Sequence, residues 1–113
     1  MNSGEFCSAL YGSRATSYHI DLLKNKVMLS VARTDGKGAI EVEFHTIRML
    51  GWACDEPTIH EQLDLSVVGL ERGDDGVWKV YFNPWDSAEL EFECDRITAD
   101  GDEVMYTGDC FEG

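Results

Sequence analysis

Apolar residues recur at every second position along most of this 113-residue chain, and no other feature restricts its fold as strongly. Ile40, Val42 and Phe44 alternate with glutamate and histidine, and residues 89–95 repeat the pattern. Successive side chains of an extended strand point to opposite faces, so this period of two gives each strand one apolar and one polar face. A helix would need apolar residues three or four positions apart. The chain is therefore predicted to be mainly β.

Turn signals separate the alternating segments at regular spacing. Asp35-Gly36-Lys37-Gly38 and Gly73-Asp74-Asp75-Gly76 have the composition of hairpin turns. We predict a single antiparallel meander of about seven strands that forms a curved sheet, a sandwich or a partly open barrel. The expected strands cover residues 18–22, 27–31, 40–50, 63–70, 78–82, 89–95 and 104–107, with a connection at 51–60 and a turn at 83–86.

One short N-terminal helix completes the prediction, around Glu5–Tyr11. Ser3 is its expected N-cap and Gly12 its expected end. With 43% hydrophobic residues, the chain can supply one core and is unlike a disordered segment. The prediction is thus a β-rich α+β fold in a single domain, residues 1–113.

Four widely spaced cysteines leave the redox state open on counting alone, since they allow two disulfides but include no C-x-x-C pair. A chain with this much core does not need disulfides, so we expect free thiols in a reducing cytoplasm. Cys94 is expected to be a small buried residue. The first twenty residues lack the pattern of a secretory signal, and no apolar run is long enough to span a bilayer.

The net charge of −13 is concentrated in the second half of the chain. Residues 1–50 carry six Lys/Arg and five Asp/Glu, whereas residues 51–113 carry three and seventeen. Nucleic acid and anionic membranes would repel such a protein. The balance favours a basic protein as partner, or serves solubility alone.

Four acids at alternate positions, Glu89, Glu91, Glu93 and Asp95, form the most distinctive candidate site, which we call the acidic strand. Residues two apart on a strand share a face, about 7 Å from each other. One interpretation is a docking surface, and the other is a solvated face, which alternation alone would produce. Scarce Lys/Arg favours docking, because surfaces that serve only solubility usually mix signs. Further acids on other strands would extend this face: Glu41, Glu43 and Asp64.

Two tryptophans are candidate anchors for a partner. Trp52 and Trp85 are expected in loops beside Asp55, Glu56 and Asp86. Aromatic residues often dominate the binding energy of an interface. The competing interpretation is that both rings cap the ends of the core.

No motif for catalysis or metal binding stands out. The Asp-Gly segments lack the spacing of a calcium loop, and the three histidines show no ligand spacing. There is no nucleophile elbow and no phosphate-binding loop. We therefore expect no enzyme activity, no metal and no cofactor.

The order of segments resembles that of small bacterial β domains of the immunity-protein kind, encoded beside polymorphic or contact-dependent toxins. The resemblance spans residues 17–97 and is carried by strand rhythm, with WKVYFNPWDSAELEFECDRI at 78–97 as the matching stretch. It implies a cytoplasmic, non-enzymatic inhibitor that binds one cognate toxin. A basic, nuclease-like toxin would suit the negative charge.

Two other functions remain open. A small-molecule carrier would close its strands into a barrel, with Trp78, Phe82, Phe92 and Phe44 lining a cavity. An enzyme would need a cleft with two titratable groups in unlike environments. The oligomeric state is also open, either monomer or homodimer, because a meander leaves edge strands.

Overall fold

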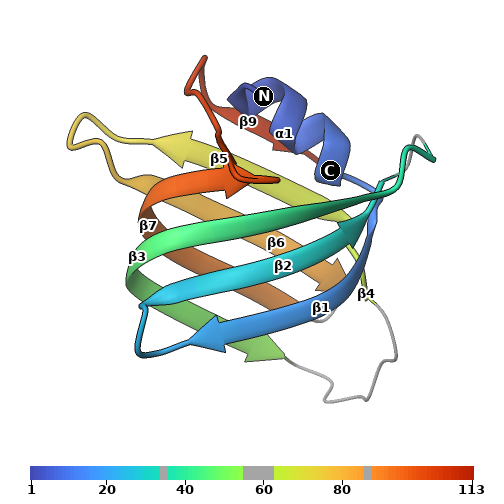
Figure 1. Ribbon diagram of the computed structural model, residues 1–113, viewed down its shortest axis with the longest axis horizontal. Helices are drawn as coiled ribbons and strands as arrows, with labels where there is room; N and C mark the ends of the chain where they lie inside the picture. Colours follow the sequence, from blue (N-terminus) through green and yellow to red (C-terminus); the bar gives the residue numbers. More distant parts are fainter. Residues whose placement is uncertain (34–35, 55–62, 86–87) are drawn as a thin grey trace.

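The computed structural model describes residues 1–33, 36–54, 63–85 and 88–113, and it confirms a mainly β fold with one short N-terminal helix (Figure 1). Every pair of neighbouring strands in the sheet is antiparallel. The elements are α1 (Ser3–Leu10), β1 (Arg14–Asp21), β2 (Lys26–Ala32), β3 (Ala39–Cys54), β4 (Leu63–Asp64), β5 (Val67–Arg72), β6 (Trp78–Trp85), β7 (Ala88–Ala99), β8 (Asp102–Glu103) and β9 (Cys110–Glu112).

The strands follow the order β4-β1-β2-β3-β7-β6-β5-β9, and β8 pairs with β7. This is two meanders, β1-β2-β3 and β5-β6-β7, joined where β3 pairs with β7, rather than the single meander expected from the sequence. The difference arises because β4 pairs with β1 before the chain enters the second meander. Over the described residues the sheet is curved but open, since its outer strands β4 and β9 do not pair with each other.

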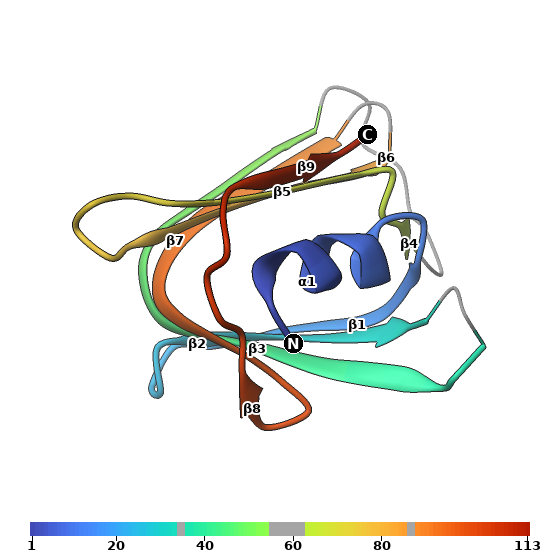
Figure 2. The ribbon, with the colours of Figure 1, turned by 90° about the horizontal axis from the view of Figure 1, so that it is seen from above.

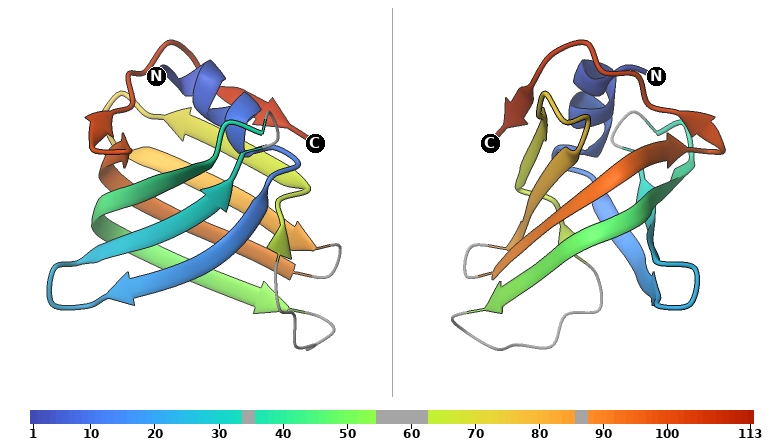
Figure 3. Two further views of the ribbon diagram at one scale, coloured as in Figure 1. Left: turned by 45° about the vertical axis from the view of Figure 1, so that its right-hand side comes forward. Right: turned by 90° about the vertical axis from the view of Figure 1, so that its left-hand side faces the viewer.

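A sharp bend in β3 produces much of this curvature. Thr46 has a φ of 59°, and the register with β7 shifts between Ile47 and Met49, which leaves Arg48 as an extra residue. Such a bulge bends a strand and increases its twist. The first part of β3 therefore runs beside β2, and its second part lies with β7 in the opposite layer (Figures 1 and 3).

The core lies on the concave side of the sheet, where α1 is enclosed by the curve (Figure 2). Phe6 and Leu10 of the helix are fully buried. The Phe44 ring meets those of Phe6, Phe82 and Phe92 at centroid distances of 6.3, 6.1 and 4.6 Å. The four rings proposed from the sequence as cavity walls, Phe44, Trp78, Phe82 and Phe92, are instead packed core.

The predicted helix is confirmed, but its N-cap is Asn2 instead of Ser3. The Asn2 side-chain oxygen accepts a hydrogen bond from the Glu5 amide at 2.8 Å, and the Glu5 carboxylate accepts one from the Asn2 amide at 3.4 Å. This reciprocal pair satisfies two amides that the first turn leaves without partners. Ser3 is buried and donates to the Gly108 carbonyl at 2.9 Å. Gly12 follows the helix with a φ of 73°, as its predicted end.

A disulfide joins Cys7 of α1 to Cys110 of β9, with their Cα atoms 6.6 Å apart. The expectation that all four cysteines are free thiols is therefore wrong. The two lie 103 positions apart in sequence, so no local pattern signalled their proximity. Cys94 is buried as predicted, and burial raises the pKa of its thiol to about 12.

Several strand ends also differ from the predictions. Residues 51–54, expected in a connection, continue β3, and residues 55–60 lie outside the described part. Residues 83–85, expected in a turn, continue β6, and Asp86 is not described. The strand expected at 104–107 is only a bridge between Met105 and Asn2.

No helix found in the described ranges is long and apolar enough to cross a membrane.

Candidate functional site

The acidic strand lies on β7, with its carboxylates on the convex, outer face of the sheet. Glu89 and Glu91 are exposed, and Glu93 and Asp95 are half-buried. The intervening residues Leu90, Phe92 and Cys94 are buried against the core. Alternation along one strand thus places the four acids on one side, as the period of two predicts.

Cations partly neutralise only one end of the acidic strand. Arg48, the bulge residue of β3, donates to both carboxylate oxygens of Asp95 at 2.5 and 3.2 Å. This hydrogen-bonded guanidinium holds the pKa of the Asp95 carboxyl below its ordinary value. Glu93 lies opposite Lys79 of β6 in the register. Glu89 and Glu91 have no cationic partner among the residues that the structure describes.

The other predicted acids belong to the opposite half of the sheet and are held locally. Glu43 accepts from the Lys26 ammonium at 3.0 Å, and that hydrogen bond lowers the pKa of its carboxyl. Glu41 accepts from the Ser30 hydroxyl. Asp64 pairs with Arg14 at 3.5 Å. These local contacts distinguish the three acids from Glu89 and Glu91.

The two tryptophans do not lie in loops, in contrast to the sequence prediction. Trp52 is in β3 opposite Leu90, a core-facing residue, so its ring belongs to the concave side of the sheet. Trp85 is the last residue of β6 and pairs with Ala88. The Trp85 side chain lies outside the described part of the structure.

One cross-strand row on the outer face combines aromatic rings, glycines and an acid. In register from β9 to β3 it contains Phe111, Gly69, Tyr81, Glu91 and Gly51. A Cβ atom at Gly69 would lie 3.4 Å from the Phe111 ring and 3.5 Å from the Tyr81 Cβ. The absence of a side chain at Gly69 thus lets the Phe111 ring lie close to β5, and Gly69, Tyr81 and Phe111 line one trough.

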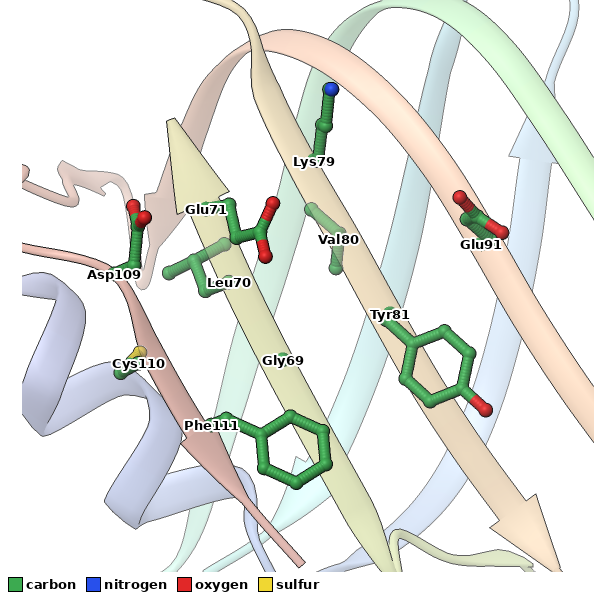
Figure 4. A pocket seen from close by; sticks show the side chains of 10 residues that line it. All are labelled: Gly69, Leu70, Glu71, Lys79, Val80, Tyr81, Glu91, Asp109, Cys110 and Phe111. Carbon is green, nitrogen blue, oxygen red and sulfur yellow. The ribbon is translucent and has the colours of Figure 1, made fainter. Parts of the chain in front are cut away.

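This trough is part of a groove of about 410 Å³, which we call the outer groove (Figure 4). The rings of Tyr81 and Phe111 lie on either side of Gly69. Phe111 is 69% exposed, although it is a large apolar side chain. The charged residues of the outer groove are three acids and one base: Glu71, Glu91, Asp109 and Lys79.

Local contacts fix the polar walls of the outer groove. Asp109 accepts from the Tyr106 hydroxyl at 2.8 Å and from the Arg72 amide at 3.2 Å. Burial, followed by the neighbouring carboxylates of Glu89 and Glu91, raises the pKa of the Tyr81 phenol, which therefore stays neutral at physiological pH. The resulting surface presents carboxylates beside flat neutral rings. Such a surface suits a guanidinium or ammonium group, which can stack on a ring and pair with a carboxylate.

Sequence reasoning identified Glu91 but missed Phe111, Gly69 and Asp109. Phe111 lies in a three-residue strand without alternation, and only its pairing with β5 brings it to the site. Gly69 did offer a signal, because a glycine inside an apolar strand often marks a close approach by another group.

Metal binding finds no support in this geometry, since the described residues contain no group of three or more His, Cys, Asp or Glu placed to hold an ion. No protein-family model matches the chain, and no curated protein matches it significantly. The candidate site is therefore defined by its own geometry and charge.

Proposed function

We propose that this domain is a non-enzymatic protein-binding module whose outer groove takes a basic segment of its partner. The observation that carries the proposal is the cross-strand row in which Phe111, Gly69 and Tyr81 form a trough ending at Glu91. Aromatic anchors beside carboxylates are the combination that recognises arginine-rich surfaces. The most specific form of the proposal is an immunity-type inhibitor of a basic, nuclease-like toxin.

The charge of the protein favours a basic partner both at long range and at contact. The net charge of −13 attracts a cationic protein and raises the rate of encounter. At contact, Glu89, Glu91 and Glu93 form no ion pair among the described residues, and of these three only Glu93 lies opposite a cation, Lys79, in the register. An arginine of the partner would supply the missing charge, and its planar guanidinium matches a carboxylate with two hydrogen bonds.

An inhibitor of this kind would act in the bacterial cytoplasm, where thiol pools oppose disulfides. The ends of the chain have a second connection that does not depend on the bond between Cys7 and Cys110. The Ser3 hydroxyl donates to the Gly108 carbonyl and accepts from the Thr107 amide at 3.0 Å. These contacts would keep β9, and with it Phe111, near α1 after reduction.

A titration with hexa-arginine peptide, followed by calorimetry at 50 and 300 mM salt, tests the binding site. We expect binding that weakens about tenfold or more at the higher salt, because exposed charges are screened. Glu89→Lys/Glu91→Lys should abolish binding. The control Asp102→Lys/Glu103→Lys makes the same charge change on exposed residues of β8, outside the outer groove, and should retain most of it. Equal losses in both double variants would reject the groove as the site.

The inhibitor role needs a separate test in cells. The domain is co-expressed with the product of the neighbouring gene, and growth is measured; a neighbouring gene that encodes no toxin would count against the inhibitor role. Wild-type protein should restore growth, Glu89→Lys/Glu91→Lys should not, and the β8 control should restore it. If wild-type protein gives no protection, the inhibitor role is wrong even where the basic peptide binds.

A further inference from the structure

The concave side of the sheet contains a second hollow, on the opposite face from the outer groove. It has a volume of about 260 Å³ and we call it the inner cavity. Its lining residues come from four strands: Tyr18, Ile20, Val27, Leu50, Trp52 and Leu90. The helix α1 is absent from this lining, because it covers a different part of the concave side.

The bend in β3 creates the inner cavity. Ile20 of β1 and Val27 of β2 are neighbours in the register, as are Trp52 of β3 and Leu90 of β7. The bulge at Arg48 carries the second part of β3 into the opposite layer, so these two pairs line the same hollow from opposite layers.

The lining has a buried base and an exposed rim. Val27 is 3% exposed and Leu90 8%, whereas Ile20, Leu50 and Trp52 are between 42% and 53% exposed. No charged side chain belongs to the lining among the described residues, and none of its polar atoms is open to the cavity. Such a lining offers water no hydrogen-bond partner, and enclosed apolar cavities of about 150 Å³ already bind hydrophobic molecules.

Tyr18 is the one lining residue with a polar side-chain group near the base. Its hydroxyl is buried and has no hydrogen-bond partner among the described residues. Burial raises the pKa of Tyr18 to about 12, so the phenol stays neutral. The inner cavity therefore presents no charge to a ligand.

We propose that the inner cavity binds a small, neutral, apolar molecule, of the size of one or two aromatic rings or a short alkyl chain. A peptide backbone would need hydrogen-bond partners that the lining does not expose. An anionic amphiphile would meet the net charge of −13 without any cation in the lining. This site lies beyond the proposed function, because Leu90 and Glu91 face opposite sides of β7.

Toluene is the first probe, titrated into the ¹⁵N-labelled protein and followed by amide and indole NMR shifts. We expect saturable shifts confined to Ile20, Val27, Leu50, Trp52 and their neighbours. Ile20→Trp places a ring in the cavity and should weaken toluene binding at least tenfold. The control Leu22→Trp makes a similar change at a position that is 86% exposed and outside the lining, and should bind as wild type does. Thermal unfolding of both variants verifies that each is folded.

Further measurements complete the test. Tyr18→Phe should bind toluene within about twofold of wild type, and octanoate should bind at least tenfold more weakly than toluene. Shifts that do not saturate, equal behaviour of the two tryptophan variants, or tighter binding of octanoate would each overturn the proposal. So would a wild-type dimer that Ile20→Trp dissociates, since a second copy would then fill the cavity. Hexa-arginine binding should not change in Ile20→Trp, so failure here is distinguishable from failure of the outer groove.

Discussion

The two meanders use the same alternation of acids and apolar residues but present different surfaces. In β1-β2-β3, the acids are held within the sheet, as in the contact between Glu43 and Lys26. In β5-β6-β7, Glu89 and Glu91 have no cationic partner among the described residues. Alternation sets which side an acid faces, and the register sets whether a cation lies beside it. The second surface therefore presents two adjacent carboxylates to a cationic partner.

The largest change in stability is expected when the aromatic contact between the two meanders is removed. Phe44 of β3 is fully buried and meets rings of α1, β6 and β7. Phe44→Ala should lower the free energy of unfolding by about 4 kcal/mol, because it removes a buried ring and leaves a cavity. Urea unfolding measures the change. A loss below about 1 kcal/mol would mean that the meanders are stabilised independently.

The disulfide should stabilise the second meander more than the first. Cys7→Ser/Cys110→Ser removes a crosslink between residues 103 positions apart, and a disulfide typically stabilises a protein by about 2–4 kcal/mol. Amide exchange should become faster in β9 while β1 and β2 stay protected. Reduction of the wild-type protein should reproduce both changes, and an unchanged unfolding midpoint would contradict this role.

A smaller effect of opposite sign is expected at Tyr18. Its buried hydroxyl lacks a hydrogen-bond partner among the described residues, so the folded state bears an uncompensated desolvation cost. Tyr18→Phe should raise the free energy of unfolding by about 1 kcal/mol. Tyr81→Phe is the matched control in the second meander, where the hydroxyl lies near Glu89, and it should give no gain. Destabilisation by Tyr18→Phe would show that its hydroxyl is satisfied in solution.

The smallest change in stability is expected when an acid is replaced by its amide, and it should differ between an acid with a cationic partner and one without. Glu43→Gln should lower stability by about 0.5 kcal/mol, whereas Glu91→Gln should leave it equal or slightly higher. The pKa of Glu43 is lowered from 4.5 in the folded state, so its contribution is present above pH 4.5 and is lost as pH falls through the lowered value. Unfolding measured from pH 7 to pH 3 should show a smaller loss of stability in Glu43→Gln than in wild type, because the lowered pKa of Asp95 contributes to both. The same profile in both proteins would remove the distinction between the meanders.

Local features were predictable because they depend on neighbours in the chain. Leu90, Phe92 and Cys94 are buried and Glu89 and Glu91 exposed because a strand alternates its side chains. The helix was placed correctly, although Asn2 and Ser3 are both good N-caps and the sequence pattern did not choose between them. The candidate site was found only in part, since Glu91 was predicted and its partners in the outer groove were not.

The alternation of residue types alone determined the fold class, the apolar face of each long strand and the outward direction of the acids on β7. Tertiary structure decided which strands are neighbours, and so it paired Arg48 with Asp95, joined Cys7 to Cys110 and placed Phe111 beside Gly69. The reason is physical: the direction of a side chain follows from its own backbone, whereas contacts between distant segments depend on how the whole sheet bends around α1.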